Sequence, residues 1–148
     1  MEAFMKISEV MSPEVRIADP DDTIQDAAQI MEENDVGFLP VGEDDRLVGM
    51  ITDRDIALRA VAKGKDPHTT LVRDVMTTKV LYCYDSDEVE AAADNMAELR
   101  VRRLPIVNAD KRLVGVVSIG DIAFLHSAAT AGKTLEGVCT PGGTRFLS

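Results

Sequence analysis

The chain has 148 residues and a mass of 16.1 kDa, and 45% of its residues are hydrophobic, which allows one core of ordinary domain size and excludes a large multidomain enzyme. Twenty-six acidic against sixteen basic residues give a formal net charge of -10, and this charge disfavours nucleic acid as a partner because it repels a phosphate backbone. No apolar run approaches the roughly 18 residues of a membrane span, and the start lacks a basic flank followed by an apolar stretch, so we expect no membrane partner and a cytoplasmic location.

The sequence repeats itself at an offset of 65 residues, which becomes 66 after a one-residue insertion around Lys111. A constant offset over this length indicates an internal duplication. We divide the chain into a first repeat at 7–62, a linker at 63–71, a second repeat at 72–127 and a tail at 128–148. The matching positions include Val10-Met11 with Val75-Met76, Ala27-Ala28 with Ala92-Ala93, Leu39-Pro40 with Leu104-Pro105, and Asp55-Ile56 with Asp121-Ile122.

Each repeat shows the periodicity of an α+β unit. In the first repeat, apolar residues at helical spacing behind an acidic start predict a helix at 24–31. Short apolar runs at 38–41 and 47–51 predict paired strands around a turn, and a second helix should begin near Asp53 and end at Gly64. The second repeat predicts a helix at 89–96 and strands at 104–107 and 113–117. With one strand in front of the first helix, the order per repeat is β-α-β-β-α.

Both repeats end their last strand with the same pattern, GMITDRD and GVVSIGD. Thr52 with Asp55, and Ser118 with Asp121, have the spacing of a capping box, in which these side chains only start a helix. The leading glycine permits close backbone approach where a strand turns into a helix, a usual geometry for holding an anion or a ribose. Two copies in matching positions favour a ligand site over capping alone.

These motifs resemble those of the CBS (cystathionine-β-synthase) domain, in the tandem pair called a Bateman module. The resemblance covers roughly residues 7–127 and rests on Val-Met near each start, the Leu-Pro-Val and Leu-Pro-Ile strands, and the two Gly-to-Asp motifs. It implies two repeats related by a pseudo-twofold axis, with adenosine nucleotides or adenosyl compounds bound in clefts between them. It further implies a sensor that forms a homodimer through helical faces and signals to a separate, unidentified protein.

The resemblance also implies a role for each motif residue. Asp55 and Asp121 would each bind ribose hydroxyls, with Thr52 and Ser118 beside sugar or phosphate. A carboxylate suits this role because it can accept from both hydroxyls of a diol. The base would be held by the opposite repeat: by Thr77, Val80, Val101 and Arg102 in the first site, and by Ser12, Val15, Val36 and Gly37 in the second.

Charge distinguishes the two expected sites. Residues 1–65 carry a net charge of -8 and residues 66–148 a net charge of -2. Arg54 lies inside the first motif and Arg102 and Arg103 begin the facing strand, so these guanidinium groups are expected to meet one phosphate chain, unless the strand arginines are merely solvated. Only Arg16 offers a cation in the second site. We therefore expect AMP, ADP or ATP in the first site, and no ligand or a less charged adenosyl compound in the second, with S-adenosylmethionine and NAD as further candidates.

The remaining reactive residues predict no further site. His68 and His126 lack a second ligand at metal-binding spacing, so we expect no metal. Cys83 is expected to be a small buried residue, and a bridge to Cys139 is disfavoured in a reducing compartment. Without a His or Cys constellation for acid-base or nucleophilic work, we do not expect an enzyme. The alternative function is a ligand-independent interaction module, in which the two aspartates only cap helices.

Overall fold

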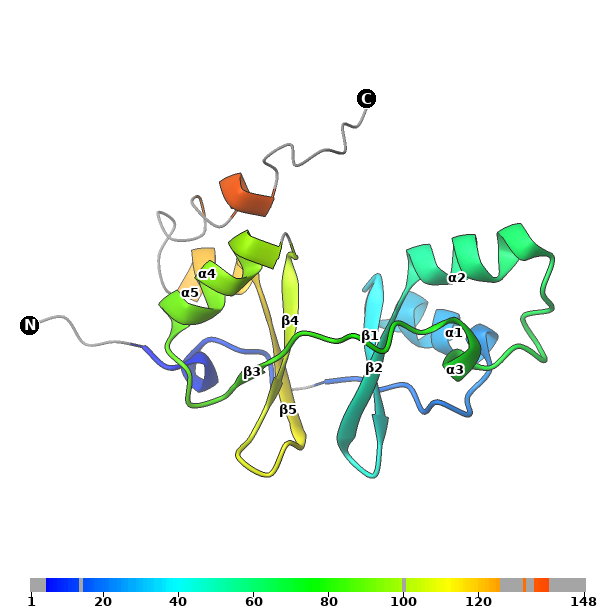
Figure 1. Cartoon of the computed structure of the whole chain (residues 1–148), viewed down its shortest axis with the longest axis horizontal. Coiled ribbons are helices and arrows are strands. Elements are labelled where there is room, and N and C mark those ends of the chain that lie inside the picture. The colour runs from blue at the N-terminus through cyan, green and yellow to red at the C-terminus, as the bar shows by residue number, and fades with distance from the viewer. Residues whose placement is uncertain (1–4, 14, 100, 126–131, 133–134, 139–148) are drawn as a thin grey trace, which may run out of the picture. The chain divides into compact units, whose positions relative to one another are not determined.

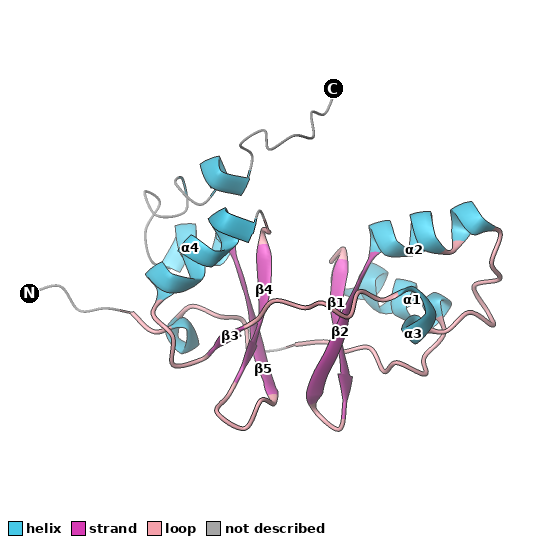
Figure 2. Ribbon diagram, in the orientation of Figure 1, coloured by secondary structure: helices cyan, strands magenta, loops and turns pink. Residues whose placement is uncertain are grey.

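The computed structural model describes residues 5–13, 15–99, 101–125, 132 and 135–138. The chain forms two compact units: unit 1 comprises Met1–Pro13, Tyr82–Ala109 and Val114–Ser148, and unit 2 comprises Glu14–Leu81 and Asp110–Leu113. In each unit, helices cover one face of a small sheet (Figures 1 and 2). The α+β class is thereby confirmed.

Unit 2 contains the helices and the hairpin of the first repeat. Its elements are α1 (Ile24–Asn34), β1 (Phe38–Glu43), β2 (Arg46–Thr52), α2 (Asp53–Arg59), the 3₁₀ turn η2 (Val61–Lys63) and α3 (Val72–Val75). β1 and β2 pair antiparallel around Asp44 and Asp45, which both have positive φ, as the primed turns of tight hairpins require. The helix expected from Asp53 to Gly64 forms, but its last turn is a 3₁₀ helix, which Gly64 ends at a φ of 71°.

Unit 1 contains the corresponding part of the second repeat. Its elements are η1 (Ile7–Glu9), β3 (Cys83–Tyr84), α4 (Val89–Leu99), β4 (Arg103–Val107), β5 (Leu113–Ser118) and α5 (Ile119–Leu125). The strands lie in the order β3-β4-β5, and β3 runs parallel to β4. From β3 onwards the second repeat follows the predicted order β-α-β-β-α.

The strand expected in front of α1 is reduced to a single bridge, which Ala18 forms with β1. The corresponding β3 of unit 1 is longer because Asp85 donates its backbone N–H to Val107 O at 2.9 Å. Pro20 stands at the position of Asp85 in the first repeat and has no N–H to donate. A single proline therefore explains why the two repeats differ here.

The leading segment of each repeat packs with the rest of the other repeat. Ile7 donates its N–H to Asp87 O at 2.9 Å and is buried in the core of unit 1. Val72, which stands 65 residues later, donates its N–H to Asp22 O at 2.8 Å and is buried in the core of unit 2. Each compact unit therefore combines the leading segment of one repeat with the remaining elements of the other, so the compact units differ from the sequence repeats.

Both cores are mostly aliphatic, as the low aromatic content requires. In α1 the buried residues are Ile24, Ala27 and Met31, whereas Ala28, which is also apolar and lies within the predicted helix at 24–31, is exposed. The buried face of α1 thus follows spacings of three and four residues, and Ala28 lies beside it. Within the described residues, no helix has the length and apolar character needed to cross a bilayer.

Candidate functional site

Both strand-to-helix junctions carry a complete capping box. Thr52 Oγ1 accepts the N–H of Asp55 at 3.0 Å, and Asp55 Oδ2 accepts the N–H of Thr52 at 3.0 Å. Ser118 and Asp121 form the same two bonds, each at 3.0 Å. The capping role that the motif spacing left open is therefore present at the start of both α2 and α5. It uses one acceptor position of each carboxylate and leaves others for a ligand.

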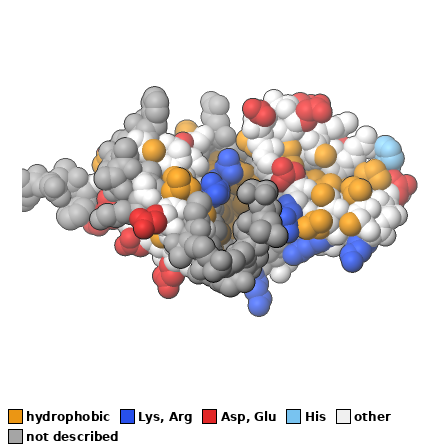
Figure 3. All heavy atoms as spheres, turned by 90° about the horizontal axis from the view of Figure 1, so that it is seen from above, with side chains coloured by type: hydrophobic (Ala, Val, Ile, Leu, Met, Phe, Trp, Pro, Cys, Tyr) orange, Lys and Arg blue, Asp and Glu red, His pale blue; other side chains and the backbone are white. Residues whose placement is uncertain are grey.

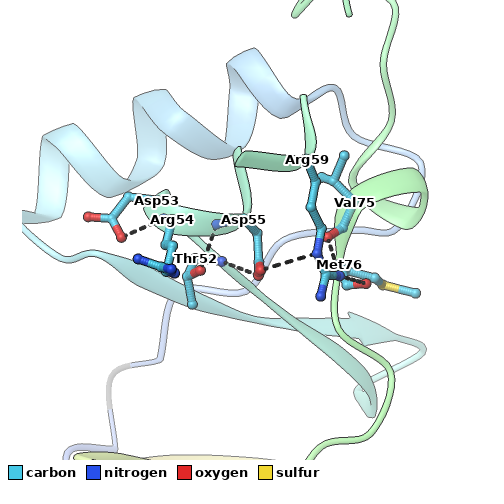
Figure 4. A network of polar contacts seen from close by, with 7 residues as sticks. All are labelled: Thr52, Asp53, Arg54, Asp55, Arg59, Val75 and Met76. Carbon is cyan, nitrogen blue, oxygen red and sulfur yellow. Dashed lines mark hydrogen bonds and ion pairs between the residues drawn. The ribbon is translucent and has the colours of Figure 1, made fainter. Parts of the chain in front are cut away.

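In unit 2, the second oxygen of the Asp55 carboxylate faces a cation. Arg59 Nε lies 3.8 Å from Asp55 Oδ1, and the two side chains are 52% and 14% exposed, respectively. Arg59 Nη1 also donates to the carbonyl oxygens of Val75 at 3.2 Å and of Met76 at 3.3 Å. Figure 4 shows Arg59 between the carboxylate and these two carbonyls. The proposed ribose acceptor is thus held from both sides, by a backbone amide and by a guanidinium group.

The glycines that lead the two motifs have close neighbours within the chain itself. A Cβ atom added at Gly49 would lie 2.7 Å from Met76 Sδ and 3.0 Å from Thr77 O. Met50 and Thr77 exchange backbone hydrogen bonds of 2.9 and 2.8 Å at this crossing. Gly115 has the same relation to Met11 and Ser12, with distances of 2.5 and 2.9 Å. The sequence argument assigned the glycine to the approach of a ligand, whereas in the structure the space is taken by the leading segment of the other repeat.

The same crossing brings two expected site residues to the motifs. Thr77 pairs with Met50, two residues before Thr52, and Val80 follows it in unit 2. Ser12 pairs with Val116, two residues before Ser118, in unit 1. Thr77 and Ser12 thus lie next to the motifs to which the resemblance assigned them.

The other expected residues belong to the unit opposite their assigned motif. Val101 and Val36 each pack against the core of their own unit. Arg102 O accepts the N–H of Ile119 at 3.0 Å, and Gly37 O accepts the N–H of Asp53 at 2.9 Å, so both contact the helix start of their own repeat. Their convergence with the opposite motif stays a prediction, as it does for the exposed Arg16 and Arg103 and the half-buried Val15.

Sequence reasoning named the exposed Arg54 but gave no role to Asp53, inside the motif, or to Arg59, four residues after it. Asp53 Oδ1 accepts the N–H of Arg54 at 2.8 Å, and a Cβ at Gly37 would lie 2.9 Å from Asp53 Oδ2. Arg59 lies outside the motif, although its spacing of four residues from Asp55 is the spacing of a helical ion pair. This spacing could have identified Arg59 as a partner of Asp55 from the sequence.

The thiol and the histidine that the structure describes give no second site. Cys83 is buried, and burial raises the pKa of its thiol, which also accepts a long contact from Asn95 Nδ2 at 3.8 Å. His68 is exposed and donates its backbone N–H to Asp66. Among the described residues, no three His, Cys, Asp or Glu side chains are grouped to hold a metal ion. Cys139 and His126 lie outside the described residues.

Comparisons with known proteins agree with this arrangement. CBS domain-containing protein YhcV of Bacillus subtilis is 41% identical over 133 residues, which cover 89% of this chain and 94% of that protein. A crystal structure of Hypoxic Response Protein I with two coordinated zinc ions has a TM-score of 0.74 and 36% identity, over 81% of this chain and 98% of that chain. The CBS domain pair of protein MJ0100, in complex with 5′-methylthioadenosine and S-adenosyl-L-methionine, has a TM-score of 0.74 and 26% identity, over 86% of this chain and 99% of that chain.

The family profile of the CBS domain matches the chain twice, at residues 7–61 and 72–126. The two matches fall on the two halves of the internal duplication, and each contains one of the capping-box motifs. The chain therefore belongs to the CBS-domain family and carries the domain as a tandem pair.

Proposed function

We propose that this chain is a regulatory sensor of adenosine-containing ligands. The observation that carries the proposal is the duplicated pair of hydroxyl and carboxylate side chains, Thr52 with Asp55 and Ser118 with Asp121, at equivalent junctions. Each carboxylate is fixed by a backbone amide and retains acceptor capacity for the two hydroxyls of a ribose. The adenosyl ligands of the MJ0100 domain pair support the same ligand class.

The proposed ligand differs between the two sites. Arg54 and the strand arginines Arg102 and Arg103 favour a phosphorylated ligand, AMP, ADP or ATP, with Asp55. Asp121 has Gly120 at the position of Arg54, so its site is proposed to stay empty or to take a less charged adenosyl compound such as S-adenosylmethionine. NAD remains a candidate because it contains the same adenosine group.

The proposed mode of action is conformational and not catalytic. A ligand can shift a conformational equilibrium only by its difference in affinity for the two states, and a separate, cytoplasmic protein would read that shift. Homodimerisation is proposed through α2 and η2, where Leu58 and Val61 are 47% and 66% exposed. Hydrophobic side chains are also visible on the surface of unit 2 (Figure 3). Analytical ultracentrifugation of Val61→Glu should show monomers if this face forms the dimer.

The test of the ligand class is a thermal-shift and calorimetric screen against AMP, ADP, ATP, NAD, S-adenosylmethionine and adenosine. A ligand at about 100 times its dissociation constant should add about 2.7 kcal/mol of apparent stability. Asp55→Asn and Asp121→Asn each keep an acceptor for the capping amide and lose the carboxylate charge. Each variant should weaken binding at its own site by about ten- to hundredfold.

Asp22→Asn is the matched control, because Asp22 Oδ2 accepts the N–H of Asp19, three residues earlier, at 2.9 Å in a turn outside both motifs. It should bind ligand like the unmodified protein. If no adenosine compound stabilises the protein, the alternative function gains support: a ligand-independent interaction module, whose aspartates are fully accounted for by their caps.

A further inference from the structure

The Arg59 side chain connects the proposed ribose acceptor to a different part of unit 2. On one side its guanidinium group faces Asp55 Oδ1 at 3.8 Å. On the other side it donates to the carbonyls of Val75 and Met76, at the end of α3. The next residue, Thr77, is bonded to β2 beside the motif. A cation near the last carbonyls of a helix also satisfies acceptors that the helix leaves open. Arg59 therefore joins two elements that a ligand at Asp55 would touch.

The second repeat has a different residue at the position equivalent to Arg59. Leu125 stands 66 residues after Arg59, at the equivalent position of α5. Val10 and Met11 are the equivalents of Val75 and Met76. An apolar side chain four residues after Asp121 can neither pair with its carboxylate nor donate to carbonyl oxygens. The capping box is therefore present in both halves, whereas position 59 carries an arginine and the equivalent position 125 a leucine.

We propose that Arg59 is a positioning residue that couples ligand binding at Asp55 to the order of residues 72–77, so that the first half of the chain responds to ligand and the second does not. This inference rests on the proposed function. At 3.8 Å the Nε atom is within ion-pair distance of the carboxylate but beyond hydrogen-bond distance. Hydroxyl donors that bind the Asp55 carboxylate would restrain the guanidinium group paired with it, and with it the two carbonyls. Such coupling is reciprocal: the factor by which bound ligand favours the ordered state of residues 72–77 equals the factor by which that order raises the affinity for the ligand. A change that disturbs residues 72–77 must therefore lower the affinity for the ligand.

The test is amide hydrogen exchange on the full chain, with and without a saturating probe, using AMP and S-adenosylmethionine in turn. The reporters are the N–H of Met76, bonded to Val72 O at 2.9 Å, and the N–H of Thr77, bonded to Met50 O at 2.8 Å. In the unmodified protein bound AMP should slow exchange at both amides at least threefold, whereas S-adenosylmethionine bound at Asp121 should not. In Arg59→Leu, which copies the second repeat, affinity should fall about three- to tenfold, and at equal saturation the slowing should disappear.

Two control variants separate the proposed coupling from a loss of charge or of folding. Lys65→Leu removes the same charge from an exposed position of the linker, outside η2 and both motifs, and should behave like the unmodified protein. Arg59→Lys keeps a cation near the carboxylate, so it should recover most of the affinity that Arg59→Leu loses. If Arg59→Leu lost affinity only because position 59 is needed for folding, a cation at this position would not restore it. Amides of α1 should exchange at unchanged rates in all three variants.

The outcomes distinguish this inference from the proposed function. If Arg59→Leu binds the probe and still slows exchange at Met76 and Thr77 as the unmodified protein does, the coupling is wrong and the proposed function stands. If neither AMP, S-adenosylmethionine nor any other compound of the screen binds the unmodified protein, the proposed function fails and the coupling fails with it. If Lys65→Leu loses the slowing as well, net charge explains the effect and the assignment to Arg59 is overturned.

Discussion

At the scale of single residues, Gly49 is tightly enclosed by the segment that crosses β2. We expect Gly49→Ala to lower the free energy of unfolding by about 1–3 kcal/mol, because the new methyl group would overlap Met76 Sδ and crowd Thr77 O. Urea denaturation measures this change. Gly120→Ala is the control: its Cβ would lie 3.5 Å from Ser118 Oγ, an ordinary contact, and alanine favours a helix. Equal stability of the two variants would show that the crossing tolerates a side chain.

The buried thiol of Cys83 gives the protein a predictable response to alkaline pH. Burial raises the pKa of this thiol above its ordinary value, so the unfolded chain releases the proton at lower pH than the folded chain does. The contribution of Cys83 to stability is therefore fully present below the unfolded pKa and is lost as the pH rises through the folded pKa. Urea midpoints of the Cys139→Ser protein should fall over this range, and they should fall less in Cys83→Ala, Cys139→Ser. An identical pH dependence of both would contradict the assignment.

Much of the site at this scale could be predicted from the sequence, because capping depends on residues only three positions apart. Thr52 and Asp55 form the box that their spacing predicted. The structural requirement for a glycine at position 49 could not be predicted. It depends on Thr77, which is distant in the sequence and is brought to β2 by the fold. Arg59 was missed for a related cause, because two of its partners are the carbonyls of another element.

At the scale of elements, the exchanged leading segments make a directional prediction. Ile7 is fully buried in the core of unit 1, so Ile7→Ala should cost about 2–5 kcal/mol there. Hydrogen exchange should accelerate in α4 and β4, which come from the second repeat, and remain unchanged in α1. Val72→Ala is the mirror control and should accelerate exchange in α1 and β1. Faster hydrogen exchange in α1 of Ile7→Ala would contradict the assignment of the leading segment 7–13 to unit 1.

The longer helices and strands could be predicted from the sequence, whereas the segments that pack against them could not. The period of apolar residues predicted α1, α4 and the two hairpins, since each of these patterns is local. The short η1 and α3 have too few residues to show a period, so nothing local indicated which core they join. The missing first strand was not predicted either, although Pro20 carries its physical cause in the sequence.

At the scale of the whole molecule, the compact units predict how the chain can be divided. A fragment of residues 1–65 contains one sequence repeat but lacks Val72 and Val75, which are 0% and 1% exposed in unit 2. Burying two such side chains contributes about 3–6 kcal/mol, a large share of the roughly 5–15 kcal/mol that stabilises an ordinary domain. A fragment of residues 14–81 keeps both valines. We expect cooperative urea unfolding for 14–81 and none for 1–65, and equal cooperativity would contradict the division.

The exchange of leading segments also bears on how such a chain arises. A molecule with a single repeat would have an unfilled position in its core, and a second copy could fill it by donating its own leading segment. Such a molecule would be a domain-swapped dimer whose folding depends on its concentration. Joining two copies by the nine-residue linker 63–71 makes the donation intramolecular, so its effective concentration no longer depends on expression level. Each half is then free to diverge, and the arginine at position 59, opposed by leucine at 125, is one such divergence.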